Sequence, residues 1–167
     1  MSKSTTNQLR SLAVAPSTRG FGFAVLEGES KLVDWGVKPA TGDKNSHCLA
    51  KVEKLFTLYR PAVLVLEDPK SSPRSARIHE LNIQLVELAK QNSIRVKLLT
   101  RAKVRGAFFA DGEGTKEALA ALLAERFPEE LAHRLPPKRR LWNSEAHAMG
   151  IFDAVALGLA RGLPKQR

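Results

Sequence analysis

Two acidic side chains stand in strongly apolar segments, where a carboxylate is costly unless something offsets its charge. Glu67 directly follows the run Ala62-Val-Leu-Val-Leu66, and Asp153 lies inside Ile151-Phe-Asp-Ala-Val-Ala-Leu-Gly-Leu-Ala160. A carboxylate at the carboxyl end of a central strand is a common place for chemistry. An Asp within an apolar helix face needs a cation or a hydrogen-bond donor opposite it. Each of the two acids could also have a purely structural role. Glu67 could cap a turn or pair with a lysine, and Asp153 could bond a backbone amide or an arginine.

The elements that would carry these residues are expected in the order βββαβαβα(α). The continuous apolar run at 62–66 is typical of a central strand with both faces covered, and alternating apolar residues predict the strands before it. This order predicts an α/β fold with a mixed five-stranded sheet, its first three strands antiparallel, and helices on both faces. A turn is expected at 16–20 and a linker at 128–140. The expected strands are 12–15, 21–26, 31–38, 62–66 and 94–100. Asn45 or Ser46 is expected to cap the first helix, and the second helix is expected at 78–92. Residues 111–115 are expected to cap the third helix, and Ser144 is expected to cap the last, which begins at Glu145.

The length of 167 residues suits one domain, expected at 10–162, with a flexible tail at 1–9 and a short one at 163–167. The single cysteine, Cys48, excludes a disulfide framework and a thiolate zinc site within one chain. No apolar run approaches the length of a membrane span, and the polar start lacks the apolar core of a signal peptide. A cytoplasmic protein that does not engage a membrane is therefore expected.

The segment Ser11-Leu-Ala-Val-Ala15-Pro-Ser-Thr-Arg-Gly20-Phe-Gly-Phe-Ala-Val25 resembles the opening hairpin of the RuvC branch of the RNase H-like nucleases. That motif reads apolar-apolar-Asp-Pro-(Gly/Ser)-Ser/Thr-Arg-x-x-Gly-(Phe/Tyr)-(Gly/Ala)-Val. The segment around Asp153 is similar to the last-helix signature of the family, Asp-Ala-x-Ala-(Leu/Val)-Ala. The resemblance covers about residues 10–161. It implies an RNase H-like fold and a metal-dependent, structure-selective endonuclease that resolves four-way (Holliday) junctions.

The resemblance also implies a metal site. In the family, carboxylates from the first strand, the end of the fourth strand and the last helix hold two Mg²⁺ (or Mn²⁺) ions, which clamp the attacking and leaving oxygens. The matching positions in this chain are Ala15, Glu67 and Asp153. A fourth acid or a histidine often lies near the last Asp, and Glu145 and His147 are the candidates here. Glu145 could equally serve the helix dipole, and His147 could be an ordinary surface or core residue. Gly150, on the helix face of Asp153, offers no side chain.

Ala15 is the departure from the pattern, because the family has its first catalytic Asp there. A methyl group cannot bridge two ions, so this chain is expected to bind metal poorly and to cleave very slowly. Two explanations remain open. The chain is a disabled variant of an active nuclease, or it is a natural member that kept binding and lost cleavage. Retention of Glu67 and Asp153 favours the first, since a protein released from catalysis has no evident reason to keep costly carboxylates.

The net charge of +10 and the pI of about 10.1 favour a partner with negative charge, and nucleic acid is the usual one. Basic side chains near the acidic site are what binding to a DNA backbone requires. The family partner is branched DNA gripped by a homodimer, which would place the protein at the nucleoid. The apolar helix face at 78–88 is the one interface signal. The candidate DNA-binding residues are Ser17, Arg19, Lys70, Arg74, Arg77, Arg101, Lys103, Arg105, Lys116, Lys138, Arg139 and Arg140.

Two other functions fit the same residues. One is a nucleic-acid-binding module without nuclease activity, which Ala15 favours. The other is an RNase H-like nuclease acting on RNA, of the YqgF type. Cleavage after the carboxylate at position 15 is restored would distinguish a resolvase from the binding module. The preference among junction, flap and RNA substrates would distinguish a resolvase from the RNA nuclease.

Overall fold

The computed structural model describes residues 9–70, 75–135 and 148–161. Within these ranges one five-stranded sheet has the strand order β3-β2-β1-β4-β5. The first three strands pair antiparallel, whereas β4 is parallel to both β1 and β5. This arrangement confirms the predicted α/β class and its mixed sheet. The strands are β1 (Arg10–Ser17), β2 (Gly20–Glu27), β3 (Lys31–Pro39), β4 (Val63–Glu67) and β5 (Arg95–Leu99).

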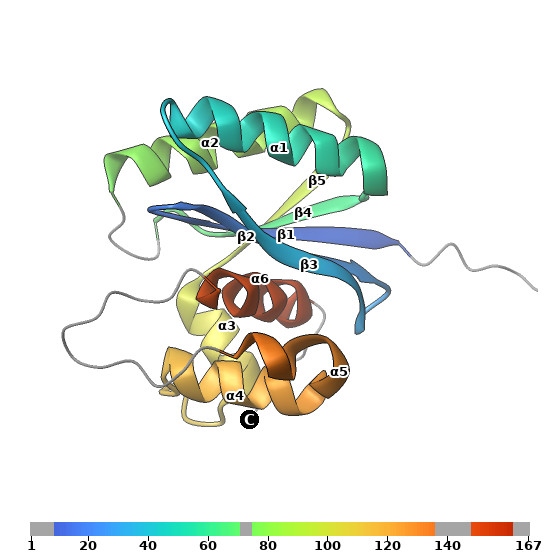
Figure 1. Cartoon of the computed structure of the whole chain (residues 1–167), viewed down its shortest axis with the longest axis vertical. Coiled ribbons are helices and arrows are strands. Elements are labelled where there is room, and N and C mark those ends of the chain that lie inside the picture. The colour runs from blue at the N-terminus through green and yellow to red at the C-terminus, as the bar shows by residue number, and fades with distance from the viewer. Residues whose placement is uncertain (1–8, 71–74, 136–147, 162–167) are drawn as a thin grey trace, which may run out of the picture.

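Helices cover both faces of the sheet (Figure 1). One face carries α1 (Lys44–Tyr59) and α2 (Ala76–Gln91). The other face carries α6 (Met149–Ala160), and three further helices lie on that side, α3 (Arg101–Phe108), α4 (Lys116–Arg126) and α5 (Pro128–Leu131), with a 3₁₀ turn at Ala132–Arg134. Among the described residues, no helix has both the length and the apolar character needed to cross a membrane.

The two faces of the sheet bury two separate apolar clusters. In β1, Leu12 and Val14 belong to the cluster beneath α1 and α2, while Ala13 belongs to the cluster around α6. Because both faces are covered, the central strands are continuously apolar. On the α6 side, β1 and β2 carry the small side chains of Ala13 and Ala24 as well as Leu26, and the small ones allow α6 to lie close to the sheet.

Helix α6 approaches the sheet closely where Gly150 faces Gly22 of β2. An ideal Cβ at Gly22 of β2 would lie 2.0 Å from the carbonyl oxygen of Gly150, so no side chain fits there. A Cβ at Gly150 would meet Gly22 at 3.3 Å, which is tight but tolerable. Asp153 follows Gly150 by three residues and so lies on the same side of α6. The contact between the two backbones therefore sets the position from which Asp153 projects.

Three local expectations were wrong in detail, and one helix was not expected. β1 continues through Pro16 and Ser17, because Gly20 adopts a φ of 148° that glycine alone tolerates easily, and this lets β2 begin after a turn of two residues. The N-cap of α1 is Asp43, whose carboxylate accepts from the amide of Ser46. The basic segment after β5 is helix α3, capped by Thr100. The expected linker at 128–140 begins with α5, where a proline starts the helix and Leu131 is buried. The expected start of the last helix lies outside the described residues.

The glycine contact predicts an asymmetric pair of stability effects. Gly22→Ala should lower the free energy of unfolding by about 3 kcal/mol or more, because the added methyl group has only backbone to displace. Gly150→Ala should stay within about 1 kcal/mol of the wild type, because the gain in helix propensity offsets mild crowding. Urea unfolding of the two variants measures both effects. A Gly22→Ala protein as stable as the wild type would contradict the close approach of α6.

Candidate active site

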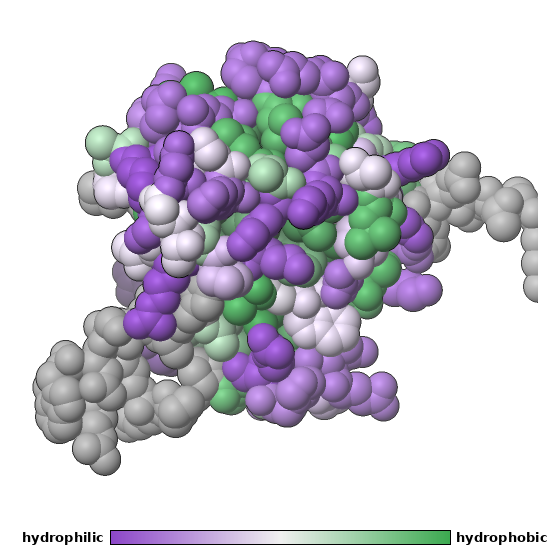
Figure 2. All heavy atoms as spheres, turned by 45° about the horizontal axis from the view of Figure 1, so that its top comes forward, coloured by the Kyte–Doolittle hydropathy of each residue, from purple (hydrophilic) through white to green (hydrophobic). Residues whose placement is uncertain are grey.

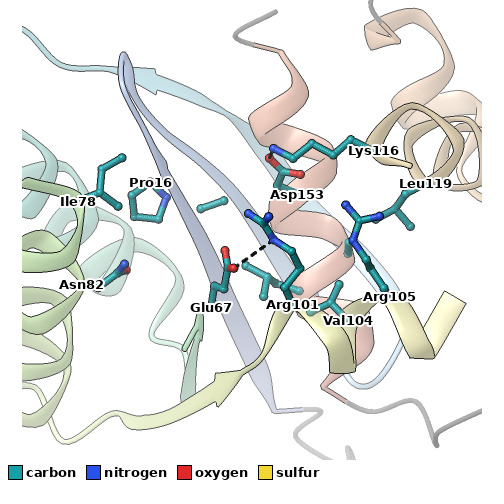
Figure 3. A pocket seen from close by; sticks show the side chains of 13 residues that line it. Pro16, Glu67, Ile78, Asn82, Arg101, Val104, Arg105, Lys116, Leu119 and Asp153 are labelled. Atoms are coloured by element: carbon teal, nitrogen blue, oxygen red, sulfur yellow. Dashed lines mark ion pairs between the residues drawn. The ribbon is translucent and has the colours of Figure 1, made fainter. Parts of the chain in front are cut away.

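A cavity of about 70 Å³ opens where the carboxyl ends of β1 and β4 meet the helices (Figure 3). Helix α2 forms one wall, and α3, α4 and α6 form the other. Ala15, Glu67 and Asp153 all line this cavity. These are the three positions that match the metal ligands of the family, and they come from distant parts of the sequence. The lining residues are Ala15, Pro16, Glu67, Ile78, Asn82, Arg101, Val104, Arg105, Lys116, Leu119, Asp153, Ala156 and Leu157.

Glu67 reaches the cavity because it is the last residue of β4, whose preceding residues are all buried. Its side chain is 20% exposed, and its Oε1 lies 3.5 Å from Nε of Arg101. Arg101 is the first residue of α3, which the Thr100 hydroxyl caps by accepting from the amide of Lys103 at 3.1 Å. The cap therefore fixes the point at which the guanidinium enters the site (Figure 3).

Asp153 faces a second cation from a different helix. Its side chain is 29% exposed, although nearly every other residue of α6 is buried. Its Oδ2 lies 3.6 Å from Nζ of Lys116, the first residue of α4. The Thr115 hydroxyl caps α4 by accepting from the amide of Ala118 at 3.0 Å. The segment 111–115 was predicted to cap a helix beginning here, and the structure confirms it.

The described residues do not fit a two-metal centre. Ala15 contributes a methyl group to the cavity, and Gly150 on the face of Asp153 contributes no side chain. Two carboxylates remain, each opposite a cation, and no cluster of three acidic, histidine or cysteine side chains exists within the described ranges. Mg²⁺ takes an octahedral shell of oxygen ligands and repels nearby cations. Glu145 and His147, the other candidate ligands, lie outside the described residues.

Ten of the twelve predicted DNA-binding residues fall into three groups. Arg101, Arg105 and Lys116 line the cavity. Arg19, Lys70 and Lys103 are exposed and lie outside its lining. Asp68, beside Lys70, caps the turn by accepting from the amide of Lys70 at 3.0 Å. Arg74, Lys138, Arg139 and Arg140 lie outside the described residues.

Arg77 and Ser17 are bound to each other inside the protein. The Arg77 guanidinium donates to the carbonyl of Ser17 at 2.9 Å and to Oδ1 of Asn45 at 3.1 Å. Asn45 returns a bond from Nδ2 to the carbonyl of Arg77 at 3.1 Å. These bonds tie the start of α2 to α1 and to the end of β1. Arg77 therefore supports the wall of the cavity, and a contact between Arg77 or Ser17 and DNA stays a prediction.

Asn82 was missed by the sequence analysis. It lines the cavity from α2, it is only 5% exposed, and its Oδ1 is buried with no hydrogen-bond partner among the described residues. A signal existed in the sequence, since Asn82 is the one polar residue in the buried stripe of Ile78, Leu81 and Leu85. A polar residue at such a position is costly when unpaired.

Comparison with solved structures identifies the fold. No protein-family model matches the chain, and no curated protein matches its sequence. The structure of RuvC from Thermus thermophilus is similar, with a TM-score of 0.66 at 16% identity, over 91% of this chain and 92% of that one. The structure of T. thermophilus RuvC in complex with a Holliday junction substrate gives a TM-score of 0.68 at 14% identity, over 93% of each chain. The fold is RuvC-like. This confirms the RNase H-like architecture that the opening hairpin predicted.

We expect the same substitution at Asn82 and at Asn45 to change the free energy of unfolding in opposite directions. Asn82→Leu should raise the free energy of unfolding by about 1 kcal/mol, because it removes an unsatisfied buried oxygen. Asn45→Leu should lower it by about 1–3 kcal/mol, because it leaves two groups of Arg77 without partners. Thermal and urea unfolding measure both. Destabilisation by Asn82→Leu would show that this amide has a partner in the folded protein.

Proposed function

We propose that this chain is a branched-DNA-binding protein of the metal-dependent, structure-selective endonuclease class, with its cleavage activity disabled at position 15. Its substrate is a four-way junction, and its place in the cell is the nucleoid. One observation carries the proposal. Position 15, Glu67 and Asp153 converge on one cavity of a RuvC-like fold, and Arg101, Arg105 and Lys116 stand around them. A phosphodiester requires such cations close to the place where it is bound.

A homodimer follows from the proposed substrate, because symmetric cutting of two strands requires two sites. The apolar face of α2 does not supply the interface, since Ile78, Leu81 and Leu85 are buried in the core of the protein itself. Hydrophilic side chains dominate the outer surface of the α1–α2 layer, with apolar ones scattered between them (Figure 2). Ile83 of α2, 46% exposed, is an apolar residue on that outer surface.

A second candidate is a natural binding module that never cuts. The two ion pairs favour it, because Arg101 and Lys116 give Glu67 and Asp153 partners that do not depend on a metal. Retention of the carboxylates then needs no recent loss of catalysis. Restoring the acid at position 15 separates this candidate from a disabled resolvase.

The test is cleavage of a labelled four-way junction in Mg²⁺ or Mn²⁺ by the wild-type chain and by Ala15→Asp. The wild type should bind the junction more tightly than duplex DNA and should not cut it. Ala15→Asp adds a third carboxylate to the cavity and should cut the junction symmetrically. Ala15→Asn, which adds a side chain of nearly the same size without the negative charge, is the matched control and should cut far more slowly.

Three other results would change the assignment. Tight junction binding without cleavage by either form supports the binding module. Preference for an RNA duplex over every branched DNA supports an RNA nuclease of the YqgF type. Equal affinity for junction and duplex by both forms contradicts the proposed substrate.

A further inference from the structure

The cavity has an excess of positive charge among its described lining residues. Three cations, Arg101, Arg105 and Lys116, stand against two carboxylates, Glu67 and Asp153. A divalent cation is held by oxygen ligands, and an excess of positive charge around those ligands opposes its binding. The charge of this cavity therefore suits an anion.

The direction of two helices adds to this balance. Arg101 begins α3 and Lys116 begins α4, so both helices start at the cavity lining. The first turn of a helix carries partial positive charge and unpaired amide groups, which favour a bound anion. Two cationic side chains and two helix starts thus face one cavity from different elements.

One lining position that could carry negative charge is instead small and apolar. Ala15 presents a methyl group to the cavity. A phosphate approaching Arg101 and Lys116 meets less repulsion there than it would with a carboxylate at position 15.

The cations are held within reach of a ligand from outside. Their pairs with Glu67 and Asp153 span 3.5 and 3.6 Å, longer than a charge-assisted hydrogen bond. The Arg101 side chain is 43% exposed and that of Lys116 is 30% exposed. Both cationic side chains are therefore accessible to a phosphate that enters the cavity.

We propose that this cavity binds a backbone phosphate of DNA directly, with Arg101 and Lys116 supplying the positive charge that metal ions would otherwise supply. Glu67 and Asp153 pair with the two cations when no phosphate is bound and compete with the phosphate for them. The inference rests on the proposed function, because it assumes that the RuvC-like domain brings DNA to this cavity. Loss of a carboxylate should strengthen DNA binding at such a site, whereas at a metal site the same loss should weaken it.

The experiment measures junction affinity of the full chain by fluorescence anisotropy, in EDTA and in Ca²⁺. Wild-type affinity should be the same in both. Arg101→Gln and Lys116→Gln should each weaken binding about tenfold and lower the salt dependence of log K by about one unit. Glu67→Gln should tighten binding about threefold, because it removes a charge that competes with the phosphate. Lys31→Gln, at the opposite end of the sheet beside Glu27, is the matched control and should change affinity less than twofold.

Two outcomes would overturn the inference while the proposed function stands. One is selective junction binding that requires a divalent ion and is lost in Glu67→Gln, as a metal site demands. The other is an effect of Arg101→Gln and Lys116→Gln no larger than that of Lys31→Gln. Absence of any preference for a junction over duplex DNA would instead overturn the proposed function. The Glu67→Gln result guards against misfolding, because a destabilised protein would not bind more tightly.

Discussion

The close packing of α6 on the sheet decides where the chemistry of this protein can occur. Gly22 and Gly150 bring two backbones together at a distance that no side chain at Gly22 would allow. Since α6 is otherwise apolar and buried, this contact fixes both its depth and its rotation. Asp153 then projects beside the ends of β1 and β4, and the caps at Thr100 and Thr115 bring two cations to meet the carboxylates.

Sequence patterns were sufficient for the sheet and for the convergence of position 15, Glu67 and Asp153. Alternation and continuous apolar runs report burial directly, and the motifs around the two acids fix their places in the strand order. Helix α3 was missed because it has only eight residues and its buried face consists of Val104, Ala107 and Phe108 alone. The ion pairs could not be foreseen, because they depend on where two helix starts fall in space. Asn82 was visible as a polar residue in an apolar stripe, but its place in the cavity needed the fold.

The cations of the cavity give a second explanation for the presence of Glu67 and Asp153. Considered in sequence alone, two costly carboxylates without their usual partner at position 15 indicate a nuclease that has recently lost its activity. In the folded protein each carboxylate faces a cation, so each has a structural reason to persist. The same arrangement removes the electrostatic attraction for Mg²⁺ and leaves attraction for phosphate. On our proposal, a RuvC-like fold here binds DNA without the metal-dependent cleavage chemistry.

The most direct test of this account is a titration of the wild-type chain with Mn²⁺, in which electron paramagnetic resonance measures the free ion. We expect no saturable binding to the wild type and saturable binding to Ala15→Asp, whose third carboxylate cancels the excess positive charge of the cavity and adds an oxygen ligand. Stoichiometric binding of Mn²⁺ to the wild type, abolished by Glu67→Gln, would contradict the account. It would show that the cations yield to a metal and that the site is a metal centre.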